Sequence, residues 1–239
     1  MKVNNYIAII LSAGKGVRLG TKYKNYAKVL IPIYNGKTSL DYNLKILSDL
    51  GVKKKIVNSH LHFKKINNFI KTKYKNDTNI KIIKEKKLLG TAQTVLRASK
   101  IFKEFDNIIV LYGDNISKIN LKKVIKNYNY RKYNFCIVSN YIKDSGNSGV
   151  IKINKFDELI SFEEKKYKYK NKPNWVNSGI YIISKKIVKM IGKKKDFGLE
   201  FIPHLIRKKI KIQVLKTRNK IFTIDNPKLL KKTRDEIKF

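Results

Sequence analysis

Residues that can bind phosphate groups are concentrated between positions 11 and 28 of the 239-residue chain. Residues 12–16, Ser-Ala-Gly-Lys-Gly, offer backbone N–H groups without bulky side chains, and Lys15, Arg18 and Lys28 add positive charge. The apolar run 7–11 precedes this loop directly, as expected of a strand that is buried on both faces. Small and cationic residues at the carboxyl end of a buried strand predict a polyphosphate site.

The spacing excludes two well-known phosphate loops. The dinucleotide-binding fingerprint requires a third glycine three residues after Gly16, where this chain has Leu19. The loop of P-loop NTPases requires Gly-Lys-Ser/Thr five residues after its first glycine, and no such triplet follows Gly14. A different phosphate-binding loop is therefore predicted.

A second candidate site residue is Asp114, which follows the apolar run 108–112. A carboxylate at the end of a buried strand can bind Mg²⁺, which takes one or two carboxylates together with substrate oxygens. The competing interpretation is that Asp114 only caps a turn. No zinc site is predicted, because His60 and His62 have no Cys or carboxylate partner nearby in the sequence and Cys136 is the single cysteine.

The net charge of +38 favours nucleic acid as a partner at first sight, but the cation that supplies it argues otherwise. Only six of the 55 basic residues are Arg, the residue that nucleic-acid readers prefer, and the lysines are scattered through every segment. Lys, Ile, Asn and Tyr all have A/T-rich codons, so we interpret the charge as the mark of an A/T-rich coding sequence. No specific nucleic-acid partner is predicted.

The elements that position these residues alternate between strands and amphipathic helices, which predicts an α/β fold with a mostly parallel sheet covered on both faces. Thr38 or Ser39 is expected to cap the first helix, with Gly51 as its stop. Further helices are expected at 63–74, 90–101, 121–130, 199–209 and from 227, and strands at 55–58, 80–83, 108–112, 135–139, 149–153, 159–163, 176–183 and 221–225. We expect a single domain over residues 1–239, with an inserted β-region at about 145–183.

Six motifs, in their order and spacing, resemble the sugar-phosphate nucleotidyltransferases, also called NTP-sugar pyrophosphorylases. The motifs lie at 11–19, 28–32, 89–92, 111–114, 162–165 and 177–181. The first loop and Leu-Tyr-Gly-Asp are similar to the pyrophosphorylase domain of N-acetylglucosamine-1-phosphate uridylyltransferase. Glu85 and Phe-Glu-Glu-Lys are similar to the heptose- and mannose-1-phosphate guanylyltransferases. The resemblance implies a Rossmann-like, three-layer αβα nucleotidyltransferase fold.

The resemblance also implies a reaction, the attack of a sugar 1-phosphate on the α-phosphate of an NTP, with Mg²⁺ as cofactor and pyrophosphate as leaving group. Arg18, Lys28 and Asp114 would be catalytic, and Asp114 and Asp225 would bind the metal, although the family spacing points to Thr223 rather than Asp225. The nucleotide would contact Leu11, Ala13, Gly14, Lys15, Gly16, Glu85, Gly90 and Thr91. The sugar phosphate would contact Gly149, Glu164, Lys165 and Asn177, with Glu163 as an alternative to Glu164.

Several alternatives stay open on the sequence. Glu85 suits the N–H donors of guanine, whereas Ala13 in place of a second glycine favours uracil or cytosine. The protein is expected to be a cytoplasmic enzyme without a membrane span or a C-terminal β-helix domain; its sugar, pathway and oligomeric state are not determined. The competing functions are a cytidylyltransferase for an alditol or choline-type phosphate, and a basic RNA-binding or regulatory protein that has lost catalysis.

Overall fold

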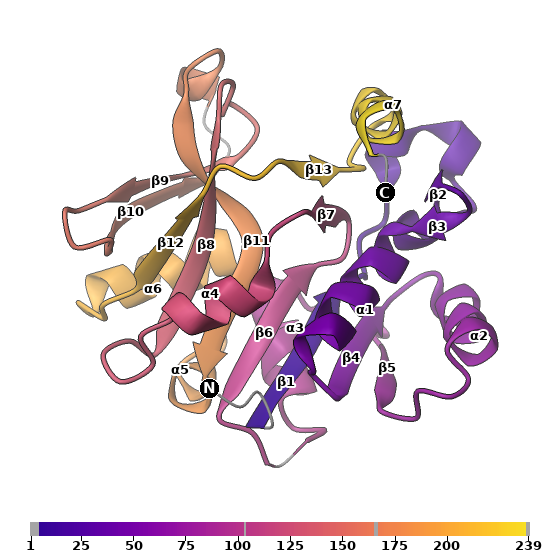
Figure 1. Cartoon of the computed structure of the whole chain (residues 1–239), viewed down its shortest axis with the longest axis horizontal. Helices are drawn as coiled ribbons and strands as arrows, with labels where there is room; N and C mark the ends of the chain where they lie inside the picture. The colour runs from indigo at the N-terminus through magenta and orange to yellow at the C-terminus, as the bar shows by residue number, and fades with distance from the viewer. Residues whose placement is uncertain (1–4, 103, 165–166, 238–239) are drawn as a thin grey trace.

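The structure, a computed structural model, describes residues 5–102, 104–164 and 167–237. A nine-stranded mixed sheet forms its centre, in the order β10-β9-β11-β6-β1-β4-β5, with β8 beside β11 and β12 beside β8 (Figure 1). The strands β5, β4, β1 and β6 are parallel, and β11 is antiparallel to β6, β8 and β9. The strands span Tyr6–Leu11 (β1), Lys54–Ser59 (β4), Ile80–Lys84 (β5), Asn107–Tyr112 (β6), Phe135–Ile142 (β8), Gly149–Ile153 (β9), Leu159–Glu164 (β10), Asn174–Ser184 (β11) and Gln213–Thr217 (β12).

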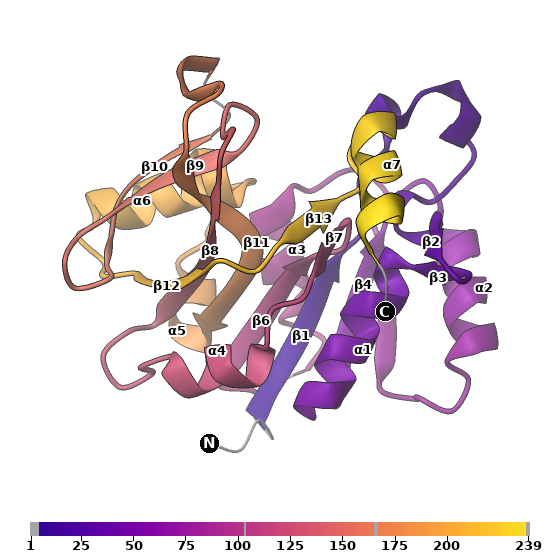
Figure 2. The same cartoon turned by 45° about the horizontal axis from the view of Figure 1, so that its top comes forward.

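Helices cover both faces of the sheet, which confirms the predicted three-layer α/β fold (Figure 2). Helices α1, α2 and α4 pack on one face, and α3, α5 and α6 pack on the other. The helices span Ser39–Leu50 (α1), Phe63–Lys73 (α2), Thr91–Ala98 (α3), Leu121–Asn127 (α4), Lys185–Lys189 (α5), Ile202–Arg207 (α6) and Pro227–Glu236 (α7).

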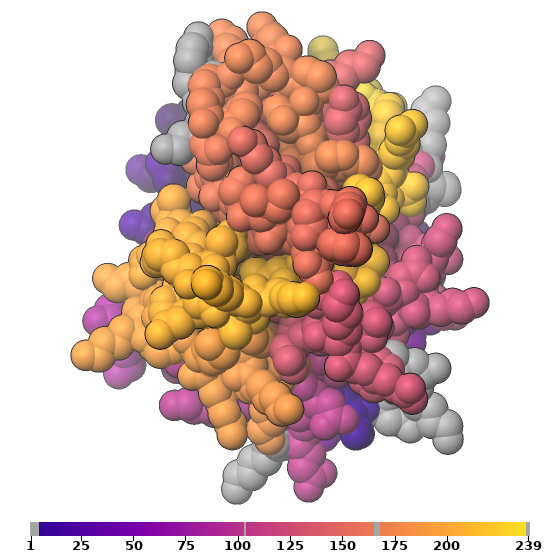
Figure 3. Space-filling model, turned by 90° about the vertical axis from the view of Figure 1, so that its left-hand side faces the viewer, coloured from indigo at the N-terminus to yellow at the C-terminus, as the bar shows by residue number. Residues whose placement is uncertain are grey.

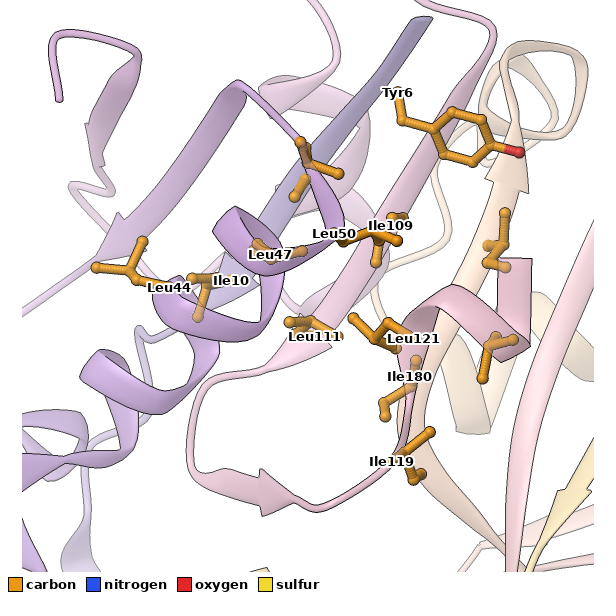
Figure 4. Close-up of a cluster of buried hydrophobic side chains, with 14 of the residues drawn as sticks. Tyr6, Ile10, Leu44, Leu47, Leu50, Ile109, Leu111, Ile119, Leu121 and Ile180 are labelled. Atoms are coloured by element: carbon orange, nitrogen blue, oxygen red, sulfur yellow. The ribbon is translucent and has the colours of Figure 1, made fainter. Parts of the chain in front are cut away.

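Alternate residues of the buried strands supply the two cores, because successive side chains of a strand point to opposite faces. Ala8 and Ile10 of β1 belong to the first core, and Ile7 and Ile9 belong to the second. Figure 4 shows Leu44, Leu47 and Leu50 of α1 lying beside Ile10, Ile109 and Leu111 in the first core.

A third, smaller core lies under the expected active site and is built from segments far apart in the chain. It contains Leu19, Ile31, Ile33, Ile116, Phe222, Ile224, Leu230 and Ile237. Two short sheets frame it: β7 (Asn115–Ser117) with β13 (Ile221–Thr223), and β2 (Pro32–Tyr34) with β3 (Lys37–Thr38). Helix α7 lies at the end of β13 and packs against it (Figure 1).

The caps of α1 confirm the sequence prediction. The Thr38 side chain accepts a hydrogen bond from Asp41 N at 3.2 Å, and Asp41 accepts one from Thr38 N at 2.8 Å, which makes a reciprocal capping box. Gly51 ends the helix in the left-handed conformation (φ 88°), which glycine adopts without steric cost.

Three predicted helices are too long. The helix predicted at 199–209 spans only Ile202–Arg207, because a π-helical turn at Phe197–Phe201 precedes it and Lys209 takes a left-handed conformation (φ 55°). Helix α3 ends at Ala98 rather than 101, because residues 99–101 form a tighter turn in which Lys100 N and Ile101 N bond to carbonyls three residues back. Helix α4 ends at Asn127 rather than 130, because Tyr128 leaves the helix to donate a hydrogen bond from its buried hydroxyl to Tyr133 O. The predicted strand 221–225 ends at Thr223, and strands β2, β3, β7 and β12 were not predicted.

Candidate active site

Two short strands bring Asp114 and Asp225 together. Strand β7 begins directly after Asp114 and pairs with β13 in antiparallel register, Asn115 opposite Thr223. The pairing continues beyond the strand, where Ile224 N donates to Asp114 O at 3.2 Å. The register therefore places the two carboxylates at the same end of this small sheet.

Both carboxylates contact Lys28. The Nζ atom of Lys28 lies 2.5 Å from Asp114 Oδ2 and 2.8 Å from Asp225 Oδ1. The Lys28 side chain is only 8% exposed, so it holds this position inside the site rather than on the surface. Burial alone lowers the pKa of Lys28, but the charges and hydrogen bonds of Asp114 and Asp225 outweigh that effect, so its pKa is raised and it remains an ammonium ion.

Arg18 completes the ion cluster from the solvent side. Its NH1 atom lies 2.6 Å from Asp225 Oδ2, and its side chain is 63% exposed. Lys15 is exposed on the same loop and has no ion-pair partner among the described residues. The site therefore combines one buried cation, Lys28, with two exposed cations on the loop, of which Arg18 is paired with Asp225.

Gly113 allows the strand end that carries Asp114 to approach the phosphate loop. A Cβ atom at this position would lie 2.7 Å from both Leu11 O and Ser12 Oγ, which is closer than real contacts permit. Gly113 N also donates to Leu11 O at 2.9 Å. Any larger residue at position 113 would push the loop 12–16 away from Asp114.

A cavity of about 260 Å³ opens between the phosphate loop, the end of β4 and the start of α3. It is lined by Leu11, Ser12, Ala13, Gly14, Lys28, Val29, Asn58, Glu85, Leu88, Gly90, Thr91, Thr94, Tyr112 and Asp114. Six of the eight residues predicted to bind nucleotide are among these, and Lys15 and Gly16 lie outside the lining. Lys28 and Asp114 join the cavity to the ion cluster.

Glu85 is buried at the base of this cavity, where every partner donates a hydrogen bond to it. Oε1 accepts from Asn58 Nδ2 at 2.8 Å and from Thr94 Oγ1 at 2.6 Å, while Oε2 accepts a longer bond from Leu89 N at 3.3 Å. Asn58 in turn accepts from Ser12 N at 2.6 Å. This chain of hydrogen bonds fixes Glu85 relative to the phosphate loop and leaves Oε2 the less engaged oxygen.

The predicted sugar-phosphate residues lie on the neighbouring β-region. A Cβ atom on Gly149 would lie 2.8 Å from Glu164 Oε2, so these two residues are in direct contact. Glu163 instead binds Lys168 at 2.6 Å and Tyr169 at 2.8 Å, on the opposite face of β10. The geometry therefore supports Glu164 over Glu163. Lys165 lies outside the described residues.

The buried Tyr181 and the half-buried Tyr112 connect the predicted sugar-phosphate residues with the cavity. Asn177 Nδ2 donates to the Tyr181 hydroxyl at 2.7 Å, and that hydroxyl donates to the Tyr112 hydroxyl at 3.3 Å. Burial raises the pKa of both hydroxyls, and the nearby charge of Glu164 raises it further. Tyr112 lines the cavity, and the two hydrogen bonds connect it through Tyr181 to Asn177.

The donor set fits a magnesium ion and no metal that needs a larger protein cage. Two carboxylates face each other across Lys28, and no group of three or more His, Cys, Asp or Glu residues that could hold a metal occurs in the described part of the chain. Mg²⁺ is commonly held by one or two carboxylates, with phosphate oxygens and water as its other ligands.

No helix in the described residues is long and apolar enough to cross a membrane.

Sequence analysis missed the residues that orient the site. Asn58 and Thr94 contact Glu85 but belong to none of the recognised motifs, and Tyr181 lies in the motif at 177–181 but was not predicted as a site residue. A signal was present for Asn58, a polar residue near the carboxyl end of a predicted parallel strand, where ligands of α/β sheets bind. Thr94 carried no comparable signal, because it occurs within an ordinary helix pattern.

Comparison with known proteins places these features in a family context. A family model described as nucleotidyl transferase matches residues 7–220. A D-glycero-alpha-D-manno-heptose 1-phosphate guanylyltransferase from Campylobacter jejuni is 30% identical over 193 residues, which are 81% of this chain and 82% of that one. The bifunctional protein GlmU from Methanocaldococcus jannaschii is 32% identical over 188 residues, 79% of this chain but only 42% of that protein.

Solved structures show the same fold. HddC from Yersinia pseudotuberculosis, in a complex with GMP-PN, is 26% identical, with a TM-score of 0.77 over 98% of this chain and all of that one. A Bacillus anthracis structure at 20% identity and a TM-score of 0.84 supports the fold alone. The Campylobacter, Yersinia and Bacillus anthracis proteins are matched over most of their own length, whereas GlmU is matched over less than half of its length.

Proposed function

Because the chain belongs to the nucleotidyl transferase family, we propose that it joins an NTP to a sugar 1-phosphate, forming an NDP-sugar and pyrophosphate. The observation that carries this proposal is the ion cluster of Asp114, Asp225, Lys28 and Arg18 at the mouth of the cavity lined by the phosphate loop. Polyphosphate chemistry without a covalent intermediate needs positioning and charge neutralisation, and this cluster is suited to both.

Each charged side chain has a place in the proposed reaction. Lys28, buried beside Asp114, neutralises charge on the reacting α-phosphate, while the exposed Arg18 and Lys15 hold the phosphates that depart as pyrophosphate. Asp114 and Asp225 would hold Mg²⁺, which when bound supplies positive charge to the phosphate oxygens. An oxygen of the sugar phosphate attacks the α-phosphorus, and the P–O bond to pyrophosphate breaks in line with it.

We assign the sugar phosphate to the inserted β-region at about 145–183, within a single domain. Figure 3 shows the end of the molecule where the β9–β10 hairpin lies, flanked by the regions of α6 and α4. Glu164 and Asn177 are polar groups that suit sugar hydroxyls, and Gly149 leaves room beside Glu164. The contact from Asn177 through Tyr181 to Tyr112 brings this region next to the nucleotide cavity.

For the base, we propose guanine. Glu85 accepts from all its partners and keeps Oε2 lightly engaged toward the cavity, and guanine is the base that presents two adjacent donors, N1–H and N2–H₂. Uracil presents a single ring N–H between two carbonyl groups, and the oxygens of these carbonyls would be repelled by a carboxylate. Two of the matches, a heptose 1-phosphate guanylyltransferase and a structure in complex with GMP-PN, support the same base.

A pyrophosphate-release screen tests the reaction. The enzyme is incubated with each of the four NTPs, Mg²⁺ and a panel of sugar 1-phosphates, with alditol and choline phosphates included. Release that requires both GTP and a sugar 1-phosphate is expected. Release with CTP and a non-sugar phosphate would establish the cytidylyltransferase alternative, and no release with any pair would favour a binding protein.

The base assignment predicts the behaviour of Glu85→Gln. Glutamine can keep the bonds from Asn58 and Thr94 on its oxygen while its amide nitrogen replaces Oε2 and gives up the long bond from Leu89 N, so we expect the fold to be retained. We expect kcat/KM for GTP to fall by about 10- to 150-fold, the equivalent of roughly 1.5–3 kcal/mol for a hydrogen bond to a charged group. Steady-state kinetics with GTP and UTP measure it, with the exposed Lys123→Met as control. Unchanged GTP preference would contradict the assignment.

A further inference from the structure

Lys28 occupies the position between Asp114 and Asp225 that a bridging metal ion would need. Its Nζ contacts Asp114 Oδ2 at 2.5 Å and Asp225 Oδ1 at 2.8 Å, so one cation already joins the two carboxylates. The second oxygen of Asp225 is held by Arg18 at 2.6 Å. A metal ion that is to bind both carboxylates must therefore displace the Lys28 ammonium.

Resting on the proposed function, we infer that Lys28 is a stand-in cation that keeps the divalent metal out of the enzyme until the phosphates of the nucleotide arrive. In the free enzyme two carboxylates face two cations, and the cluster is neutral. A divalent ion that entered alone would give the cluster a net charge of +2. Because Lys28 is almost fully buried, this uncompensated positive charge would be unfavourable there.

Phosphates remove this obstacle because they offer Lys28 and Arg18 new partners. A nucleotide brings several negative charges to the same place, so each cation can exchange a carboxylate oxygen for a phosphate oxygen. The freed carboxylates then receive the metal. Metal and phosphate should therefore bind together, and Lys28 moves only between neighbouring partners within one site.

The chain offers a matched control in Lys55. This lysine is also buried, 4% exposed, and binds one aspartate, Asp77, at 2.8 Å. It lies near the amino end of β4, whereas the active site lies at the carboxyl end of the parallel strands. Lys55→Met therefore removes the same charge and the same kind of ion pair without touching the site.

The test measures the affinity of the enzyme for Mn²⁺. Binding is monitored by the increase in water proton relaxation that occurs when Mn²⁺ binds to a protein. We expect wild-type enzyme to bind Mn²⁺ weakly alone and at least about ten-fold more tightly with pyrophosphate. Lys28→Met should bind Mn²⁺ alone at least about ten-fold more tightly than wild type. Lys55→Met should behave as wild type.

Two outcomes would overturn the inference: no gain in Lys28→Met, or equal wild-type affinity with and without pyrophosphate. The second comparison needs no variant, so it stands even if Lys28→Met does not fold. A different result would show that Asp114 and Asp225 do not bind the metal at all. In that case the double variant Asp114→Asn, Asp225→Asn would still bind Mn²⁺ with pyrophosphate as tightly as wild type.

Discussion

Asp225 differs from the other aspartates of the chain in the cations that it binds. It accepts from both Lys28 and Arg18 beside a buried ammonium, whereas Asp49 forms an exposed pair with Lys45 one helical turn away. Exposed pairs of the second kind contribute about 0.3–0.5 kcal/mol. The Asp225 cluster is therefore better explained by chemistry than by stability.

This difference predicts the behaviour of Asp225→Asn. The variant keeps the shape of the side chain but removes its charge, and we expect turnover to fall by at least about 10²-fold, since charge stabilisation carries the proposed reaction. Pyrophosphate release under saturating substrates measures the effect. Asp49→Asn, which also loses an ion pair with a lysine, should retain wild-type turnover. An Asp225→Asn enzyme with near wild-type turnover would exclude Asp225 as a metal ligand.

The same residue shows where motif spacing stops being informative. The family spacing points to Thr223, but Thr223 is the last residue of β13, pairs with Asn115 and accepts from Thr233 Oγ1 on its carbonyl. The carboxylate that reaches Lys28 comes two residues later. The antiparallel register decides this, and β7 is too short, at three residues, to be recognised from its sequence.

Among the elements, those with strong local signals were predictable. Helix α1 has a capping residue, a regular apolar face and a terminal glycine, and its observed bounds agree with the expected ones. The buried strands β1 and β6 are continuous apolar runs, so their positions were clear as well. The short strands β7 and β12 depend on long-range pairing with β13 and β8, which no local pattern specifies. Strands β2 and β3 instead form a local hairpin around Asn35-Gly36, a turn signal that the prediction did not use.

The first turn of α1 predicts a pH-dependent contribution to stability from Asp41. Burial acts to raise the pKa of Asp41, but hydrogen bonds from Lys73, Tyr74 and Thr38 outweigh it, so its pKa is lowered in the folded protein. Its stabilising effect is therefore complete above the unfolded pKa of about 3.9 and is lost as the pH falls through the folded pKa.

We accordingly expect Asp41→Ala to lower the free energy of unfolding by about 1.5–3 kcal/mol at neutral pH, the range for hydrogen bonds to a charged group. Urea unfolding measured from neutral to acidic pH should show the difference from wild type shrinking below about pH 4. Asp235→Ala, at an exposed position in α7, should show neither effect. A difference independent of pH would mean that packing, and not charge, is lost.

At the scale of the whole molecule, the net charge of +38 acts on stability and on association. Like charges repel one another in the compact state, and the repulsion acts over about 30 Å at 0.01 M salt but only about 8 Å at 0.15 M. The ion cluster is part of this field, yet its two carboxylates make it locally neutral.

Stability should therefore increase with salt. Between low and physiological NaCl we expect the melting temperature to rise by a few degrees, about 2–4 °C for each kcal/mol in a chain of this size. A variant with glutamine at the exposed Lys64, Lys71, Lys123 and Lys126 should melt higher at low salt and respond less to NaCl. A melting temperature that falls with added NaCl would show that ion pairs outweigh the repulsion.

The pairing of β7 with β13 determines when, during synthesis of the chain, the proposed active site is completed. Asp114 follows Lys28 by 86 positions and Asp225 follows it by 197 positions, so synthesis completes the ion cluster long after Lys28 has been made. A chain ending at Lys220 keeps every strand of the large sheet but loses β13 and Asp225. It should show a folded circular dichroism spectrum and release no pyrophosphate, and measurable release would refute this. A nascent chain is then expected to stay inactive toward nucleotides until β13 has paired with β7.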